Sequence, residues 1–289
     1  MSTIDHAHLR ALVAVVDEGS FEQAAAALHL TPSAVSQRIK ALETSAGRVL
    51  VRRTKPAACT EAGEPYLRLA RQIDALVRDV LGGDPSAATS IPLAVNSDSL
   101  ATWVRPALAS VGSGVSFDLH REDEEHSAGL LRSGAVVAAI TADNQPVQGC
   151  SVTRLGTMRY RPVASRAFNE RWFPDGATAE ALSAAPVVFF DRKDALQDRY
   201  LRSRTRTRLA PPRHYVPGSA DFAAAVRLGL GWGMLPDQQR HLDGNDQLVC
   251  FDPRRHLDVV LHWQQWTLHT PVLDSIAEAV RAAAAEHLT

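Results

Sequence analysis

The sequence predicts an α/β protein of two domains that are joined by a long helix. Three observations support this prediction. The first 60 residues place apolar side chains at helical spacing, residues 61–81 continue that spacing, and from residue 91 short apolar strands alternate with helical segments. A chain of 289 residues, with 45% hydrophobic and 22% charged residues, is long enough for two hydrophobic cores of ordinary size.

The first 46 residues predict three short helices. Asp5 stands before an apolar stripe at helical spacing, and Gly19 is placed to end that helix. Ser20 resembles the first residue of a capping box, which starts the second helix. Thr31 is a favourable N-cap directly before Pro32, which suits the first position of the third helix. The short turn between the second and third helices indicates a helix-turn-helix motif.

A small wing and a long linker are expected next. Residues 49–53 are β-branched and end near a proline, which predicts a β-wing. Residues 61–81, capped by Thr60, predict a long helix that stops at two glycines, and the stretch up to residue 90 has linker composition. Apolar residues recur along this helix at spacings of three and four, close to the period of paired helices. They are Tyr66, Leu69, Ile73, Leu76 and Val80, and we expect them to form a dimer interface.

The remaining chain predicts strands and helices in alternation. The expected strands are 91–95, 115–120, 136–140, 187–190, 232–235 and 259–263. This alternation indicates a mainly parallel sheet, and about 200 residues are enough for either one sheet or two small lobes. The glycines at 229, 231 and 233 lack the spacing of a phosphate-binding loop and instead predict a tight turn from a helix to a strand.

Composition excludes several classes of protein. The net charge of −1 predicts neither nucleic-acid nor membrane binding for the chain as a whole, so any electrostatic signal is local. Neither a secretory signal nor an apolar run of membrane-spanning length occurs, and we expect a soluble, cytoplasmic protein. The three widely spaced cysteines are expected to be reduced thiols without a metal. Hydrolase and metalloprotease motifs are missing, so we expect no enzyme, and His262 is expected to be a satisfied core residue.

The third predicted helix has a polar face that suits DNA. Ser33, Ser36, Gln37 and Lys40 share this face, because their spacing is i, i+3, i+4 and i+7. Residues 31–60 contain six basic residues and one acidic residue, so phosphates are the obvious partner of this segment. A solvated amphipathic helix and a basic hairpin would each explain one of these two features separately. The N-cap, the short turn and the predicted dimerisation helix occur together with them, which favours a DNA-binding motif. The DNA-binding candidates are Thr31, Ser33, Ser36, Gln37, Arg38, Lys40, Arg52 and Arg53.

Residues 21–25 and 31–43 resemble the N-terminal winged helix-turn-helix of LysR-type transcriptional regulators, and the resemblance continues through Arg52, Arg53 and residues 60–63. It covers the full chain. It implies a winged helix-turn-helix DNA-binding domain in residues 1–60 and a dimerisation linker helix and hinge in 61–90. It further implies an effector-binding domain in 91–289, built from two α/β lobes similar to those of periplasmic binding proteins. The lobes are roughly 91–161 plus 264–289, and 162–263, with a small-molecule cleft between them.

Two segments indicate the chemistry of the effector. Residues 94–103 predict a strand that passes into a helix through small polar residues, where free backbone N–H groups can bind a carboxylate, although ordinary capping explains the same residues. Residues 122–125 are four consecutive acids at a strand end, where α/β proteins often bind ligands, although a charge run is more often solvated. Together they fit a ligand with a carboxylate and a cationic tail, such as a basic amino acid.

Residues 96–103 and 122–124 resemble the ArgP/LysG branch of the family, which controls export of lysine and arginine. The resemblance implies lysine or arginine as effector, with no other cofactor. It adds Thr141, Ser219 and Asp221 as positions in the cleft. The full set of effector-binding candidates is Asn96, Asp98, Ser99, Glu122, Asp123, Thr141, Ser219 and Asp221. Residues 199–208, where arginines alternate with other residues, depart from the branch, and we expect a solvated strand or loop there rather than a second polyanion site.

Different classes of function remain open at this point. The first is a ligand-responsive regulator that binds double-stranded promoter DNA as a homodimer or dimer of dimers and controls an amino-acid exporter gene. The second is a small-molecule-binding or enzymatic α/β protein whose N-terminal helices serve only in assembly. A third is an architectural DNA-binding protein with a different effector. The polar face of the third helix and the wing arginines favour the first class.

Overall fold

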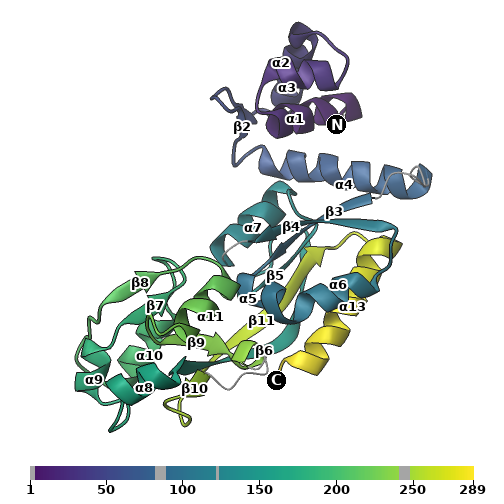
Figure 1. Ribbon diagram of the computed structural model, residues 1–289. Coiled ribbons are helices and arrows are strands. Elements are labelled where there is room, and N and C mark those ends of the chain that lie inside the picture. The colour runs from purple at the N-terminus through teal and green to yellow at the C-terminus, as the bar shows by residue number, and fades with distance from the viewer. Residues whose placement is uncertain (1–3, 82–88, 122–123, 241–247) are drawn as a thin grey trace.

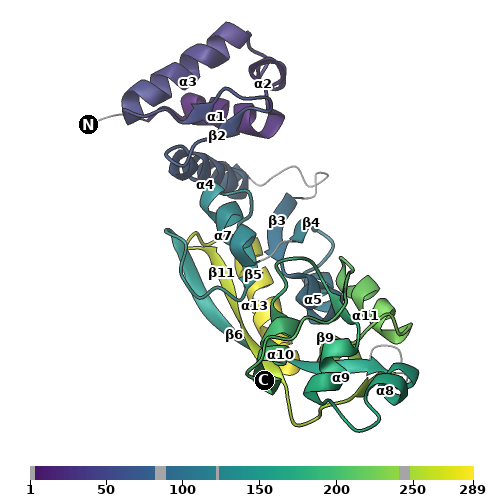
Figure 2. The ribbon, with the colours of Figure 1, turned by 90° about the vertical axis from the view of Figure 1, so that its left-hand side faces the viewer.

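A helical N-terminal domain, a long helix and a larger α/β domain follow one another along the chain in the computed structural model (Figure 1). The structure describes residues 4–81, 89–121, 124–240 and 248–289. The long helix, α4 (Glu64–Leu81), lies between the N-terminal helices and the α/β domain in both views (Figures 1 and 2). The two domains therefore meet through α4.

The three N-terminal helices are α1 (His6–Glu18), α2 (Phe21–Ala27) and α3 (Pro32–Ala46), as predicted. Their caps explain their bounds. Asp5, Ser20 and Thr31 each accept a hydrogen bond from a backbone N–H in the first turn, at 2.8, 3.1 and 3.2 Å. Gly19 ends α1 in the left-handed conformation, with φ of 68°. Local sequence signals thus fix this part of the fold.

The predicted wing is confirmed as a two-stranded antiparallel hairpin of β1 (Val51–Arg52) and β2 (Ala58–Cys59). The carboxylate of Glu43, near the end of α3, accepts hydrogen bonds from the backbone N–H groups of Leu50 at 2.8 Å and Val51 at 3.3 Å. The hydroxyl of Thr60 donates to the carbonyl of Val49 at 2.8 Å. The base of the wing is therefore tied to the third helix on one side and to the start of the linker on the other.

The linker helix begins three residues later than expected. Thr60 accepts a hydrogen bond from the N–H of Gly63 at 3.1 Å, and this turn precedes the helix. Arg71 bridges the two domains: it forms an ion pair with Asp17 of α1 and donates to the carbonyl of Ser133 at 3.2 Å, at the end of α7 (Glu124–Ser133). The linker is consequently held by both neighbours.

A single sheet of seven strands runs through the α/β domain, in the order β10-β6-β11-β5-β3-β4, with β9 also paired to β6. The strands are β3 (Thr89–Val95), β4 (Val115–Arg121), β5 (Ala138–Thr141), β6 (Cys150–Ser165), β9 (Gly233–Pro236), β10 (Leu248–Cys250) and β11 (Leu257–Trp266). The expectation of a mainly parallel sheet is wrong. Among the described strands of this sheet the parallel pairs join β3 to β4 and β5, whereas β11 pairs antiparallel with both β5 and β6. The reason is that β11 returns from the far end of the domain and enters the sheet between them, so it runs opposite to β5.

The domain consists of two lobes that share this sheet, a choice that periodicity alone left open. The first lobe carries β3, β4 and β5. The second carries the parallel pair of β7 (Val187–Phe189) and β8 (Arg213–Tyr215), and the long strands β6 and β11 extend from one lobe toward the other (Figure 1). The first lobe's helices are α5 (Ser97–Ser99), a π-helical turn (Leu100–Val104), α6 (Arg105–Ser110), α7 and α13 (Pro271–His287). Those of the second are α8 (Arg166–Trp172), α9 (Ala179–Ala184), α10 (Leu196–Arg204), α11 (Ser219–Arg227) and α12 (Asp237–Arg240).

The arginine-rich segment 199–208 is not a strand, and its first half is not a loop. It begins within α10, which continues to Arg204. Tyr200 and Leu201 are buried in the core of the domain, and Leu196 packs against it. These three side chains have helical spacing, so burial of their apolar surface overrides the alternation of the arginines. The predicted turn after α11 is confirmed, with Gly229 at φ of 80°.

The three cysteines are free thiols. Within the described ranges, no group of three or more histidine, cysteine, aspartate or glutamate side chains is arranged to hold a metal ion. The helices of the described residues are all too short or too polar to cross a lipid bilayer.

Candidate functional site

Helix α3 lies on the side of the N-terminal domain that is away from the α/β domain (Figure 2), and its predicted polar face, the recognition face, carries Ser33, Ser36, Gln37 and Lys40. Ser33, Gln37 and Lys40 are exposed, and Ser36 and Arg38 are half-buried. The opposite face carries buried apolar residues, including Ile39. Nothing in the described structure covers the polar face, and a double helix can approach it.

Thr31 has a structural role at the start of this helix. Its hydroxyl oxygen accepts the N–H of Ala34 and lies 3.0 Å from the hydroxyl of Ser33. One lone pair of Thr31 is thus used inside the protein. Ser33 is oriented by this contact, which places its hydroxyl at the first turn of the helix, where short side chains reach base edges.

The wing arginines are exposed but anchored. Arg52 donates to the carbonyl of Cys59 at 3.3 Å, and the guanidinium of Arg53 lies 4.7 Å from the centre of the Phe21 ring. The acidic residue of segment 31–60, Glu43, is occupied by the backbone of the wing. Its charge is therefore directed into the hairpin base, and the positive charges dominate the outer surface of this segment.

The expected dimer stripe on α4 divides into two sets. Tyr66 and Ile73 pack partly against the core of their own N-terminal domain. Leu69, Leu76 and Val80 are exposed, by 37%, 40% and 82%. The exposed set still lies along one side of the helix and is the part of the stripe available to a second copy of the chain.

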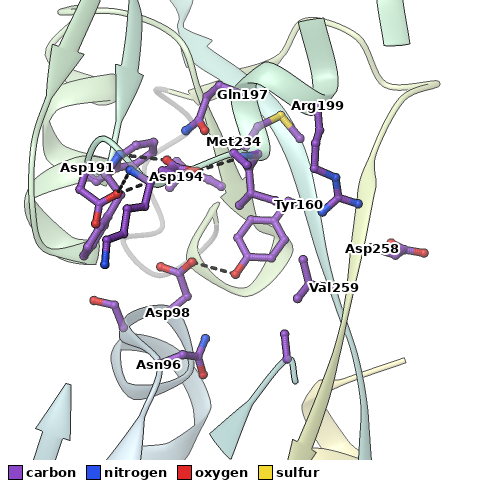
Figure 3. Close-up of a pocket in the computed structure, with 18 of the residues that line it drawn as sticks. Asn96, Asp98, Tyr160, Asp191, Asp194, Gln197, Arg199, Met234, Asp258 and Val259 are labelled. Atoms are coloured by element: carbon purple, nitrogen blue, oxygen red, sulfur yellow. Dashed lines mark hydrogen bonds between the residues drawn. The ribbon is translucent and has the colours of Figure 1, made fainter. Parts of the chain in front are cut away.

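A cavity of about 890 Å³ lies between the two lobes of the α/β domain. Residues of both lobes line it, together with residues of the shared strands β6 and β11. The polar residues that line it include Asn96, Asp98, Tyr160 and Asp194 (Figure 3), together with His262, the aspartates Asp191 and Asp258, and the basic residues Arg121, Lys193 and Arg199. This volume is at the upper end of the range for small-molecule sites.

Asp98 connects the lobes at the centre of this cavity. Its carboxylate accepts a hydrogen bond from the hydroxyl of Tyr160 at 2.8 Å and contacts the hydroxyl of Ser219, the first residue of α11, at 2.6 Å. Burial raises the pKa of Asp98, and these two hydrogen bonds only partly oppose that rise. No ion pair with a described residue compensates its charge.

Ser219 has two acceptors close to its hydroxyl group. Its single hydroxyl proton is within reach of two acceptors, Asp98 Oδ1 and the Oε1 of Gln239 at 3.2 Å. The side-chain nitrogen of Gln239 donates to the carbonyl of Ser219 at 2.8 Å, which fixes the orientation of the amide. The hydroxyl of Ser219 can donate to only one of these two acceptors at a time.

Asp194 is a second buried carboxylate on the cavity wall, and it lies in the loop between β7 and α10. It accepts backbone N–H groups from Phe190 at 2.9 Å and Leu196 at 3.0 Å. Burial raises the pKa of Asp194; the hydrogen bonds from Phe190, Leu196 and Gln197 partly oppose that rise, and the negative charge of Asp98 adds to it. The two lobes thus bring two carboxyl groups to one cavity.

The other predicted effector residues have different positions. Asn96 lines the cavity, and its Oδ1 is buried without a hydrogen-bond partner among the described residues. The hydroxyl of Ser99 is likewise buried and unpartnered in this part of the chain, but Ser99 is not on the cavity wall. Thr141 is buried at the end of β5 and accepts the N–H of Asp143 at 3.1 Å. Asp221 is exposed in the first turn of α11 and does not line the cavity.

Glu122 and Asp123 lie outside the described residues.

Sequence reasoning missed Tyr160 and Asp194 and misplaced His262. His262 is half-buried on the cavity wall, with its Nδ1 unpartnered within the described structure, so it is not a satisfied core residue. Tyr160 was missed because strand β6 was not predicted. Arginines at 154, 159 and 161 obscure an alternation that puts Met158 and Tyr160 inside, and this period of two is the signal that could have found the strand.

A helix-turn-helix with an uncovered basic face, joined to a two-lobed domain with a central cavity, defines a ligand-responsive DNA-binding regulator. The bacterial regulatory helix-turn-helix family of lysR type matches residues 6–64, and the LysR substrate binding domain matches residues 87–285. These matches cover most of the chain. The protein belongs to the LysR family of transcriptional regulators and is not an enzyme.

Named relatives are similar over their full length. A LysG protein of Corynebacterium efficiens, described as a lysine export transcriptional regulatory protein, is 44% identical over 284 residues, which are 96% of this chain and 97% of that protein. The crystal structure of ArgP from Mycobacterium tuberculosis has a TM-score of 0.93 and 46% identity and covers 99% of both chains. Full-length LysG of Corynebacterium glutamicum with bound effector Arg has a TM-score of 0.82 and 39% identity, covering 98% of this chain and 99% of that chain.

Substitutions in the wing and in α3 are expected to have separable effects on DNA binding. Arg52→Ala or Arg53→Ala weakens binding to all duplex sequences about equally and lowers the salt slope by about one unit, because one phosphate contact is lost. Gln37→Ala weakens the binding free energy by about 1 to 3 kcal/mol, mainly on the cognate site, because base contacts carry the specificity.

Filter binding at several salt concentrations measures both effects. Arg166→Ala, an exposed arginine of the second lobe, is the matched control. An unchanged salt slope in the wing variants would remove these arginines from the interface.

Substitutions in the exposed part of the α4 stripe are expected to reduce the mass of the protein in solution. Leu76→Asp together with Val80→Asp places two charges on the apolar side of the helix, where a second helix would have to bury them. Sedimentation measures the mass. Val49→Asp, at an exposed apolar residue on the wing, is the control and should leave the mass unchanged. If the double variant retains both the mass and the DNA affinity of the wild type, α4 is not the interface.

Proposed function

We propose that this regulator senses lysine or arginine in the cavity between its lobes, and that it binds promoter DNA as a homodimer or dimer of dimers. It controls an amino-acid exporter gene. The wing arginines Arg52 and Arg53, with Lys40, contact phosphates, while Ser33, Ser36, Gln37 and Arg38 of α3 contact the bases. The protein needs no cofactor besides its effector, and it acts in the cytoplasm.

The observation that carries the effector assignment is the carboxyl group of Asp98, which has no ion-pair partner among the described residues and shares the cavity with a second carboxyl group, that of Asp194. The buried position of Asp98 makes the ionised form unfavourable when the cavity holds no cation. A guanidinium or ammonium group of a ligand would supply the missing charge and additional hydrogen bonds. Asn96 offers a buried acceptor beside it. A basic amino acid has two cationic groups and one carboxylate, and it fits a cavity whose less exposed charged groups, Asp98 and Asp194, are acidic and whose lining also carries Arg121, Lys193 and Arg199.

The relatives support the same ligand class. The Corynebacterium glutamicum structure holds arginine as its effector, and the Corynebacterium efficiens relative is named for lysine export. Both are similar to this chain over nearly all of its length. Because Asp98 contacts Ser219 across the lobes, a ligand that replaces this contact changes the relation between them. A difference of about 1 to 3 kcal/mol between two arrangements is enough to switch promoter binding several-fold or more.

Calorimetry with the twenty common amino acids is expected to show binding of lysine or arginine. Asp98→Asn should weaken this binding by about tenfold or more, because the ligand cation loses its buried counter-charge. Asp118→Asn, an exposed acid of β4 outside the cavity, is the control and should bind like the wild type. Binding of only acidic or purely apolar amino acids, with no response to lysine or arginine, would contradict the proposal.

The affinity for a basic amino acid is expected to rise with pH between about pH 5 and pH 8. Burial raises the pKa of both Asp98 and Asp194, so part of each carboxyl population is neutral at the acidic end, and a cation binds the ionised form better. Calorimetry over this pH range measures the slope. Asp98→Asn should flatten it. A slope of the opposite sign in the wild type would mean that these carboxyl groups do not bind the cation.

A further inference from the structure

Asp194 has the geometry of a preorganised ligand-binding group. Two backbone N–H groups, those of Phe190 and Leu196, hold its carboxylate at 2.9 and 3.0 Å, one on each oxygen. The side chain of Gln197 adds a third hydrogen bond, so about one of the four lone-pair sites of the carboxylate remains for a ligand. Asp194 belongs to the second lobe, and Asp98 belongs to the first, so the cavity separates the two groups (Figure 3). The position of Asp194 is therefore set before any ligand arrives.

The other acids on the cavity wall are already used within the protein. Asp258 forms a two-pronged ion pair with Arg159, at 2.8 and 2.9 Å, and this pair lowers the pKa of Asp258. Asp191 accepts two N–H groups of its own loop, from Lys193 at 2.7 Å and Asp194 at 2.8 Å, with the same oxygen. The contacts of Asp98 and Asp194 in the described ranges are likewise hydrogen bonds and not ion pairs, but they hold both oxygens of each carboxyl group, whereas those of Asp191 hold one.

Asp98 and Asp194 carry like charges when both are ionised, and this state is energetically unfavourable when the site holds no cation. Two carboxylates on the walls of one cavity repel each other, and a positive group placed beside each of them relieves that repulsion. Asp98 has Asn96 as a neighbour, whose buried Oδ1 is unpartnered in this part of the chain. An ammonium group needs several acceptors at once, and this corner of the cavity supplies them.

We infer that Asp194 binds the side-chain cation of the effector, whereas Asp98 and Asn96 bind the ammonium group at its α-carbon. This assignment rests on the proposed function and adds a specificity-determining residue to it. It places the two positive groups of a basic amino acid against two carboxylates on opposite lobes. A neutral amino acid of the same length satisfies only one of them. Selectivity for a cationic side chain is then a property of the second lobe.

The test compares arginine with citrulline, which has the same chain length and a neutral end. The intact protein should bind arginine more tightly than citrulline. Asp194→Asn keeps a side-chain acceptor for the loop but loses the charge, and it should weaken arginine binding by roughly tenfold to hundredfold while citrulline binding changes little. Calorimetry on the full-length chain gives both dissociation constants. Asp194→Ser, whose hydroxyl also accepts a backbone N–H, serves as a second variant if the first does not fold.

Asp191→Asn is the matched control, because it removes an acid from the same loop and the same cavity wall. It should leave the preference for arginine over citrulline unchanged. Equal losses in the Asp191 and Asp194 variants would show that loop structure, not charge, is responsible and would overturn the assignment. So would an unchanged preference in a folded Asp194 variant. If the intact protein binds neither arginine nor lysine, the proposed function itself fails, and that result is distinct from both.

Discussion

The two lobes of the α/β domain meet at the carboxyl group of Asp98, and the functional cavity depends on this contact. Asp98 stands at the start of the helical segment after β3, Ser219 begins α11 of the second lobe, and Tyr160 comes from the shared strand β6. A buried carboxyl group without a counter-ion among the described residues is costly. The contact joins the lobes, and under the proposed function a ligand cation that replaces it would make the lobes sensitive to the ligand.

The linker helix gives this sensitivity a route to the DNA-binding domain. Arg71 touches Asp17 of α1 and the last carbonyl of α7, and α7 follows β4, whose final residue, Arg121, lines the cavity. Arg68 packs closely against Gly134, which leaves no room for a side chain there. A rigid connection of this kind is needed because the recognition face of α3 and the cavity belong to different domains.

The N-terminal domain could be predicted nearly residue by residue, because its helices are bounded by local signals. Asp5, Ser20 and Thr31 cap helices through atoms two or three residues away, and no distant contact is needed to place them. The helix at 196–204 shows the limit of such reasoning. Its arginines alternate like a strand, but the buried Tyr200 and Leu201 decide the conformation through contacts with the core of the lobe.

The sequence by itself determined the helix-turn-helix, the wing, the linker helix, and the expectation that Asn96, Asp98 and Ser219 belong to a ligand site. Only the tertiary structure decided that β11 enters the sheet antiparallel, that Tyr160 and His262 reach the cavity, and that Asp194 faces the same space as Asp98. The physical reason is the separation along the chain over which each kind of interaction acts. Caps and periodicity act within a few residues, whereas Asp98 and Asp194 are brought together by strands and helices that are far apart in the chain.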